Sequence, residues 1–374
     1  MPADQLLAIG AAAGLPCDAV LALDSLHPSN HPGFQLRVTV ADDRVIAADP
    51  QVGLMHRSAE KLFESRDLRQ AMLLADRHDW LAPFTSEVVM ALALEDALGI
   101  VPPERATWTR MLLLEVERIR ATLPFLASVS GAARESLAAT GMQITRAWES
   151  VTGARMHPGF ARIGGVATAV DAADRALLRD VVNLVDEFAA ALRPVIEAET
   201  ARLGGLAALT RVQAEGFGLG GPVGRASGVP LDLRRDAPYL AYAELTPLLE
   251  APVHVEGDAR ARYLVLLEQV TVSVGLARAA LARLEDLGDG PIDVILPKVV
   301  RLPEGTTYAS IEGPLGISGC LAVGAGDKFP TRMKIRSASF ATMSAMGTAL
   351  VGTPLPLLAD AVMSLPVVIG DVDR

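Results

Sequence analysis

Histidine, arginine and aspartate side chains, which move protons or stabilise negative charge, gather in short segments of this 374-residue sequence. The segments are His27–His31 (HPSNH), His56–Leu62 (HRSAEKL), Asp76–Trp80 (DRHDW) and Gly153–His157 (GARMH). An imidazole has an unperturbed pKa of about 6.5, so His31 suits proton delivery near neutral pH. Arg57 and Arg77 would add fixed positive charge and hydrogen-bond donors.

His31 also fits less specialised roles. It could be a loop histidine bonded to nearby backbone. A zinc pair formed by His27 and His31 is disfavoured, because Pro28 opposes a helix there. The charged groups further along the chain also have an alternative role. Arg57, Glu60, Arg77 and Asp79 could form ion pairs that hold a helix–loop junction.

Hydrophobic patterning predicts the elements that must position these segments. Alternating apolar residues over 34–48, around Asp42 and Asp43, predict an antiparallel hairpin. A helical pattern from Glu87 ends near Gly99, before two prolines, and the next runs through Trp108. The later predictions are helices over 172–203 and 258–287, a glycine-rich loop over 216–228, and short strands over 306–312, 320–323 and 333–335.

Composition excludes several classes of protein. The net charge of −10 argues against nucleic acid as a partner, because neutralising phosphates needs a basic surface. Cys17 and Cys320 are the only cysteines, so this chain alone cannot build an iron–sulfur, nickel or zinc-thiolate site. Their scarcity fits a reducing compartment. Hydrophobic residues make up 51%, which indicates either a helix-packed core or a surface buried against partners.

The apolar ends of the chain are not predicted to cross or enter a membrane. Residues 1–17 lack the basic region of a secretory signal, so we expect none. The most apolar stretch, Ala345–Gly370, contains three prolines and Asp360. Because unpaired backbone groups are costly in lipid, we expect a buried irregular segment there.

Taken together, these segments resemble the 49 kDa subunit (the D subunit) of respiratory NADH–quinone oxidoreductase (complex I), a family related to nickel–iron hydrogenase large subunits. The resemblance covers roughly 26–374. Gly153–His157 matches the family motif without change, and Asp76–Trp80 corresponds to Asp-Arg-Leu-Asp-Tyr. Further matching segments are Leu231–Arg234, Pro238-Tyr239 with Tyr242, Gly257-Asp258 with Arg262-Tyr263, Glu312–Gly319, Lys334–Arg336 and Gly370–Arg374.

The resemblance implies a fold and a setting. The fold would be mainly helical (α+β), a hydrogenase-large-subunit-like core with small antiparallel β elements near both termini. We expect an N-terminal β region over 1–55, a helical domain over 56–300 and a mixed region over 301–374. The chain would be one component of an NADH:quinone oxidoreductase (a translocase) with subunits B, C and H as partners, held peripherally on the cytoplasmic side of the cell membrane.

The resemblance also implies roles for five residues. His31 would lie at the head of the quinone pocket, where an imidazole can protonate a quinone oxygen, and Trp80 would line that head. Arg57, Arg77 and His157 would face the terminal [4Fe–4S] cluster of the B subunit. Positive charge beside a cluster raises its reduction potential, and a titrating histidine couples reduction to proton uptake. Quinone would be the substrate, with no metal on this chain.

Trp80 departs from the family pattern, in which a tyrosine supplies a phenol proton; indole only donates a hydrogen bond. A segment that is charged in the family corresponds here to Gly131–Met142, which is nearly uncharged. The aspartate that pairs with the pocket histidine in the family has no clear counterpart in this sequence. Gly288–Pro303 is too short for the family's histidine-containing helix. These departures weaken the expectation that quinone chemistry drives proton pumping.

Two functions therefore stay open. The first is a working D subunit, with NADH oxidised on another subunit because this chain has no Gly-x-Gly-x-x-Gly turn. The second is a divergent structural paralogue in a complex I-like or membrane-bound hydrogenase-like assembly, without quinone reduction of its own. Nickel–iron hydrogenase large subunits bind their metals through two pairs of cysteines, one early in the chain and one near the C-terminus. Residues 76–83 and 366–374 contain no cysteine, so the sequence excludes a nickel–iron centre.

Overall fold

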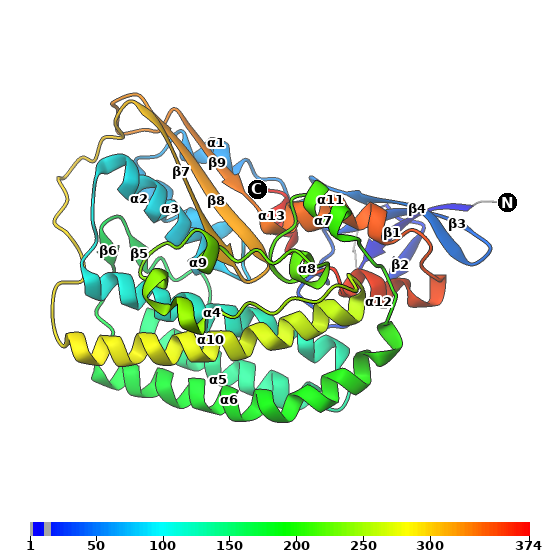
Figure 1. The fold of residues 1–374 in the computed structure, drawn as a ribbon. Helices are drawn as coiled ribbons and strands as arrows, with labels where there is room; N and C mark the ends of the chain where they lie inside the picture. The colour runs from blue at the N-terminus through cyan, green and yellow to red at the C-terminus, as the bar shows by residue number, and fades with distance from the viewer. Residues whose placement is uncertain (1–2, 11–15) are drawn as a thin grey trace.

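The computed structural model describes residues 3–10 and 16–374, and long helices form one side of it (Figure 1). The bundle consists of α4 (Glu104–Val129), α5 (Arg134–Thr152), α6 (Ala172–Thr200) and α10 (Ala259–Leu287). Local signals start them: Asp171 and Asp174 form a capping box on α6, and Asp258 accepts a hydrogen bond from the Ala261 amide at 2.8 Å on α10. The predicted helices over 172–203 and 258–287 are confirmed.

Helix α10 is long and apolar enough to cross a membrane by composition. It packs instead against α4 and α6, and most of its apolar side chains are buried there. A core helix of a protein passes the same test of length and hydropathy.

The N-terminal sheet has the order β2-β1-β3-β4 and contains the predicted hairpin. Asp42 and Asp43 both have positive φ, as a tight hairpin turn requires. The sheet also holds two strands that the sequence pattern did not predict, and these two pair in parallel. Its strands are β1 (Ala3–Ile9), β2 (Ala19–Leu21), β3 (Gln35–Ala41) and β4 (Arg44–Gln51).

The C-terminal sheet is antiparallel, and helix α3 (Pro83–Leu98) packs against it. Its strands are β7 (Gly305–Gly313), β8 (Gly316–Gly324) and β9 (Arg332–Arg336), which confirms the three short strands predicted from the sequence. A small antiparallel pair consists of β5 (Ala161–Arg162) and β6 (Gly165–Val166). The expected mainly helical α+β fold, with β elements near both termini, is therefore confirmed.

Short helices connect these layers. They are α1 (Ala59–Phe63), α2 (Leu68–Met72), η1 (Ala75–Arg77), η2 (Ala201–Leu203), α7 (Arg211–Gly216), α8 (Gly221–Ala226), α9 (Leu233–Asp236), η3 (Tyr242–Leu248), α11 (Ala338–Ala349), η4 (Leu355–Leu357), α12 (Leu358–Met363) and α13 (Ile369–Val372). The loop predicted over 216–228 is wrong in part, because α8 occupies its centre. The stretch Ala345–Gly370 is also more helical than expected, although its helices are short and largely buried.

One hydrophobic core extends from β1 to α13. The C-terminal residues return to the start of the helical region, where Arg374 donates a hydrogen bond to the Ile335 carbonyl at 2.8 Å. In Figure 1 the C-terminus accordingly lies beside β9 and α13. This return brings the last five residues against the segments that the sequence singled out. The division at residues 55 and 300 stays a prediction.

Candidate functional site

A cavity of about 270 Å³ opens where α1, η1 and the C-terminus meet. Its wall combines apolar side chains with charged ones. The lining residues are Met55, Arg57, Ala59, Leu62, Leu74, Arg77, His78, Trp80, Gly370, Asp373 and Arg374. We call this space the Trp80 cavity. Three of the five predicted site residues therefore line one cavity, although they come from two separate stretches of sequence.

Two arginines border the Trp80 cavity with largely free guanidinium groups. Arg57 donates to the Arg77 carbonyl oxygen at 3.3 Å, and Arg77 pairs with Asp76 at 3.0 Å while its side chain stays 53% exposed. The ion pairs considered as the alternative, among Arg57, Glu60, Arg77 and Asp79, do not form between these four residues. Glu60 instead pairs with Arg332 of β9 at 2.7 Å, so the two cavity arginines keep charge available for a partner.

His157 lies beside this pair but outside the cavity lining. Its Nδ1 is 2.9 Å from the Asp76 carbonyl oxygen, and because a carbonyl can only accept, Nδ1 carries the proton. Its side chain is 25% exposed, and Nε2 has no hydrogen-bond partner among the described residues. Asp76 therefore connects His157 to Arg77, since its carboxylate binds the arginine while its carbonyl binds the histidine.

His31 reaches the cavity through Trp80. The two rings pack with centroids 5.2 Å apart and an interplanar angle of 33°. The Gly33 amide donates to His31 Nδ1 at 3.0 Å, so Nε2 carries the proton of the neutral ring. Burial lowers the pKa of His31 below its usual value. The backbone bond considered for a loop histidine is thus present, and Nε2–H has no acceptor within the described part of the chain.

His27 has a structural role by comparison. It is buried, its Nε2 donates to the Met363 carbonyl at 2.8 Å, and its Nδ1 accepts from the Ser29 amide at 3.2 Å. Burial lowers its pKa to about 4. No group of three or more metal-ligating side chains occurs among the described residues. His27 therefore anchors the loop that carries His31.

Two buried glutamates that sequence reasoning missed hold the helix behind the cavity. Glu117 of α4 accepts hydrogen bonds from the amides of Phe84 and Thr85 at 2.8 and 2.7 Å, which caps the first turn of α3. Glu87 of α3 accepts from the Phe160 and Ala161 amides at 2.8 and 2.7 Å, which fixes the segment after His157. Burial raises the pKa of both carboxyl groups.

A larger apolar groove of about 730 Å³ lies on the other side of Trp80, between α4 and α5. The nearly uncharged stretch Gly131–Met142 supplies part of its wall through Leu137, Gly141 and Met142. Arg120, Arg146 and Arg155 lie at the same groove. Trp80 therefore separates two hollows, one bordered by arginines and one mainly apolar.

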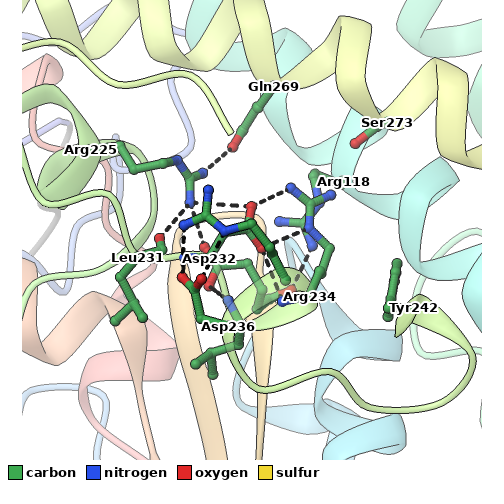
Figure 2. Close-up of polar contacts among 12 residues, drawn as sticks. Arg118, Arg225, Leu231, Asp232, Arg234, Asp236, Tyr242, Gln269 and Ser273 are labelled. Atoms are coloured by element: carbon green, nitrogen blue, oxygen red, sulfur yellow. Dashed lines mark hydrogen bonds and ion pairs between the residues drawn. The ribbon is translucent and has the colours of Figure 1, made fainter. Parts of the chain in front are cut away.

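A second set of charged residues is buried far from solvent (Figure 2). Arg234 binds Asp232 and Glu115 at 2.7 and 2.9 Å, and Arg225 binds Glu312 at 2.7 Å. Arg118 completes the set by donating to the Glu312 carbonyl at 2.5 Å. We call these six residues the buried ion network. The network has three arginines and three carboxyl groups, and it joins α4, α8, α9 and β7.

The arginines of this network lower the pKa of two of its carboxyl groups. Burial alone would raise the pKa of Glu115, but the charges of Arg234 and Arg118 outweigh burial and lower it. The same competition lowers the pKa of Asp232. Tyr242 also donates to Glu115 at 2.5 Å. The sequence matches at 231–242 and at Glu312 therefore mark a structural cross-link.

Comparison with known proteins identifies the family. The family described as "Respiratory-chain NADH dehydrogenase, 49 Kd subunit" matches residues 139–300 and 294–374. The second D subunit (D 2) of the NADH-quinone oxidoreductase of Salinispora tropica is 44% identical over 98% of this chain and 97% of the relative. The D 2 protein of the same description from Streptomyces griseus is 42% identical over 99% and 96%.

A solved structure has the same fold. A chain in the structure of "the membrane-bound sulfane sulfur reductase (MBS), an archaeal respiratory membrane complex" superposes with a TM-score of 0.86 at 30% identity. The match covers 94% of this chain and 96% of the other. By sequence and by fold, this chain belongs to the family of the 49 kDa subunit, or D subunit, of respiratory NADH–quinone oxidoreductases.

Proposed function

We propose that this chain forms the quinone-binding cavity of a complex I-like NADH:quinone oxidoreductase, beside the terminal [4Fe–4S] cluster of the B subunit. The observation that carries the proposal is the packing of His31 on Trp80 at a cavity bordered by Arg57 and Arg77. The wall formed by Trp80 suits the ring of a quinone, and the wall formed by Arg57 and Arg77 suits a negatively charged neighbour.

The chemistry of the residues supports this arrangement. The free Nε2–H of His31 can donate to a quinone oxygen, and the indole of Trp80 offers a flat apolar face with a single donor. A mostly apolar pocket with few convergent polar groups is typical of small-molecule sites. His31 would act as the proton donor, and Trp80 would position the ring.

The cluster-facing role rests on charge and access. Arg57 and Arg77 are exposed, and His157 keeps one ring nitrogen free. These groups are not metal ligands. Placed against a partner's cluster, they would stabilise its reduced form by charge and hydrogen bonding. Electrons from NADH would reach quinone through that cluster, with subunits B, C and H as neighbours and peripheral contact with the membrane arm on the cytoplasmic side.

A specific observation favours the alternative, a structural paralogue without quinone reduction. Trp80 cannot release a proton, and a structure of similar fold belongs to a sulfane sulfur reductase. In that case the same cavity would face a cluster whose electrons pass to another acceptor.

One experiment on the assembled complex separates the two. Quinone reductase turnover is compared for the parent, His31→Ala and Trp80→Tyr, with His254→Ala as control because His254 pairs with Glu268, away from the cavity. Loss of a general acid predicts a decrease of about 100-fold or more for His31→Ala. Unchanged turnover in His31→Ala, with no inhibition by quinone analogues, would refute the quinone site. Absence of a copurifying [4Fe–4S] subunit would refute the cluster-facing role.

A further inference from the structure

The turn at residues 76–80 differs from the family pattern at two positions together. The family's Asp-Arg-Leu-Asp-Tyr is Asp76-Arg77-His78-Asp79-Trp80 here. The tyrosine that could release a proton is replaced by tryptophan, and a leucine two residues earlier is replaced by histidine. The turn therefore exchanges one side chain that can transfer a proton, the family's tyrosine, for another, His78, two residues earlier.

The His78 side chain lies between two spaces. On one side it lines the Trp80 cavity together with Trp80. On the other side it lines a void of about 10 Å³ together with Ser86, Ser318 and Asp371. A void of this size, with polar groups around it, is about the smallest that holds one water molecule. His78 thus connects the cavity to a buried polar position.

His78 is buried, with 6% of its surface exposed, and its Nδ1 has no hydrogen-bond partner among the described residues. The other deeply buried histidine, His27, has both ring nitrogens bonded to backbone. Buried polar atoms without partners are rare in folded proteins, because each loses its bonds to water. A leucine at position 78 would avoid that cost. His78 Nδ1 is therefore open to a water molecule in the adjacent void or to a proton.

The charged groups around His78 come from several elements. Burial lowers the pKa of His78, while the negative charges of Asp371 on α13 and Glu60 on α1 oppose that change. The positive charges of Arg374 and His157 act in the same direction as burial. His78 is consequently neutral near neutral pH, and negative charge arriving in the cavity would favour its protonated form.

We propose that His78 is the second proton donor to quinone in this chain, replacing the phenol that Trp80 lacks. This inference rests on the proposed function. Reduction of quinone to quinol takes two electrons, from the partner's cluster, and two protons. For one proton, the protonated His31 ring releases its Nε2 proton to a quinone oxygen and returns to the neutral ring, whose Nδ1 accepts from the Gly33 amide and which regains a proton from water. For the other, an N–H bond of the protonated His78 ring breaks and an O–H bond forms on the quinone, which leaves a neutral imidazole that regains a proton from water.

The test uses the assembled complex and the leucine that the family carries at this position. His78→Leu should reduce kcat for quinone reduction by about 100-fold with KM changed less than about threefold, because a proton-transfer step is lost while binding is kept. The pH dependence of kcat below about pH 7 should flatten. The double variant His78→Leu/Trp80→Tyr should recover most of the lost turnover, since it restores the family's phenol.

Controls distinguish failure of this inference from failure of the proposed function. His254→Leu should leave turnover unchanged, and reduction of the partner's cluster by NADH should stay normal in His78→Leu. Parent-like turnover and pH profile in His78→Leu, while His31→Ala is inactive, would overturn the role of His78 and leave the quinone site standing. Loss of cluster reduction in His78→Leu would make the residue structural. A parent complex that reduces no quinone would overturn both proposals.

Discussion

The buried ion network and the Trp80 cavity contain similar residue types in opposite states. In the network, Arg225 and Arg234 are fully buried, and each binds carboxylates of the same chain at 2.7 Å. At the cavity, Arg57 binds one backbone carbonyl, Arg77 is half exposed, and His78 has an unpartnered Nδ1 among the described residues. Charges that satisfy one another hold the fold, whereas those left partly free can act on something outside the chain.

The comparison also explains why matches to a family motif are ambiguous. Arg234 and Arg77 both lie in segments that match the family, yet their surroundings differ completely. A buried ion pair repays its desolvation only when its partners stay in place. An exposed arginine loses little when it is unpaired. Burial and pairing therefore assign Arg234 to structure and leave Arg77 available for the proposed role toward a partner.

Replacing an arginine of the network should have the largest effect. Arg234→Met removes the nearest charged partner of both Glu115 and Asp232 and leaves the network with one more buried negative charge than positive charges. We expect a loss of about 3–5 kcal/mol in the free energy of unfolding, measured by urea denaturation of the full-length chain. Arg235→Met is the matched control, because Arg235 is one-third exposed and pairs with Asp236 near the surface. Equal losses of unfolding free energy in the two variants would show that the buried ion network is no more important for stability than a surface ion pair.

The second prediction concerns pH and the buried His27. Its pKa is about 4 in the folded chain and 6.5 without the fold, so the unfolded chain binds a proton first as pH falls. Its contribution to stability is therefore complete above about pH 6.5 and is lost between 6.5 and 4. The difference corresponds to about 3 kcal/mol at roughly 1.4 kcal/mol per pH unit.

Comparison of the parent with His27→Gln, by urea denaturation from about pH 7.5 to about pH 4, isolates this contribution. The stability of the parent relative to the variant should decrease across that window. A constant difference would show that His27 is not held neutral by burial. His254, which is partly exposed and paired with Glu268, provides the control position.

The helical core could be predicted because its signals are local. Asp258 caps α10 through the amide of Ala261, and Gly99 ends α3 with positive φ. Strands β1 and β2 were missed for the opposite reason. β1 pairs with β3, which follows much later in the chain, and the three residues of β2 are too few to show alternation. The N-terminal sheet is therefore decided by tertiary contacts.

The candidate site, like the fold, could be predicted from the sequence only in part. Residue type and motif indicated His31 and Arg77 from the sequence, but the cavity depends on Gly370 and Arg374 packing beside residues near position 80. The alternative ion pairs of Glu60 with Arg57 or Arg77 do not form, because Glu60 binds Arg332, on a strand far along the chain. Proximity of this kind follows only from the complete fold.

Crowding the cavity without changing its charge is the third test. A Cβ atom at Gly370 would overlap the ring of Trp80 and the His78 carbonyl. Gly370→Ala should cost about 1–3 kcal/mol by overpacking and should also reduce quinone turnover, since Trp80 must move from His31. Gly347→Ala is the control: its Cβ would meet the Ala48 carbonyl at 2.7 Å, in a region away from the cavity. If both variants lost stability and neither lost turnover, Trp80 would not position the substrate.

The smallest effect on stability is expected for Arg57, an exposed arginine that makes few contacts with the rest of the chain. Arg57→Gln removes one exposed guanidinium whose only hydrogen bond in the described chain is to the Arg77 carbonyl, so the stability of the chain should hardly change. The reduction potential of the partner's cluster should fall, because the reduced cluster loses a favourable positive neighbour. Two charges about 4 Å apart in water interact by about 1 kcal/mol, which is roughly 40 mV for a one-electron couple, so we expect a shift of that order or smaller.

A matched variant shows whether that shift belongs to the cavity. Arg66→Gln removes an exposed arginine bonded only to Ser65 in the described chain, and it should leave the potential unchanged in the same redox titration. Equal potentials in both variants would place the cluster elsewhere. A shift confined to Arg57→Gln would show that a charge left free within the chain serves its neighbour, because the two substitutions remove the same charge and differ only in where it lies.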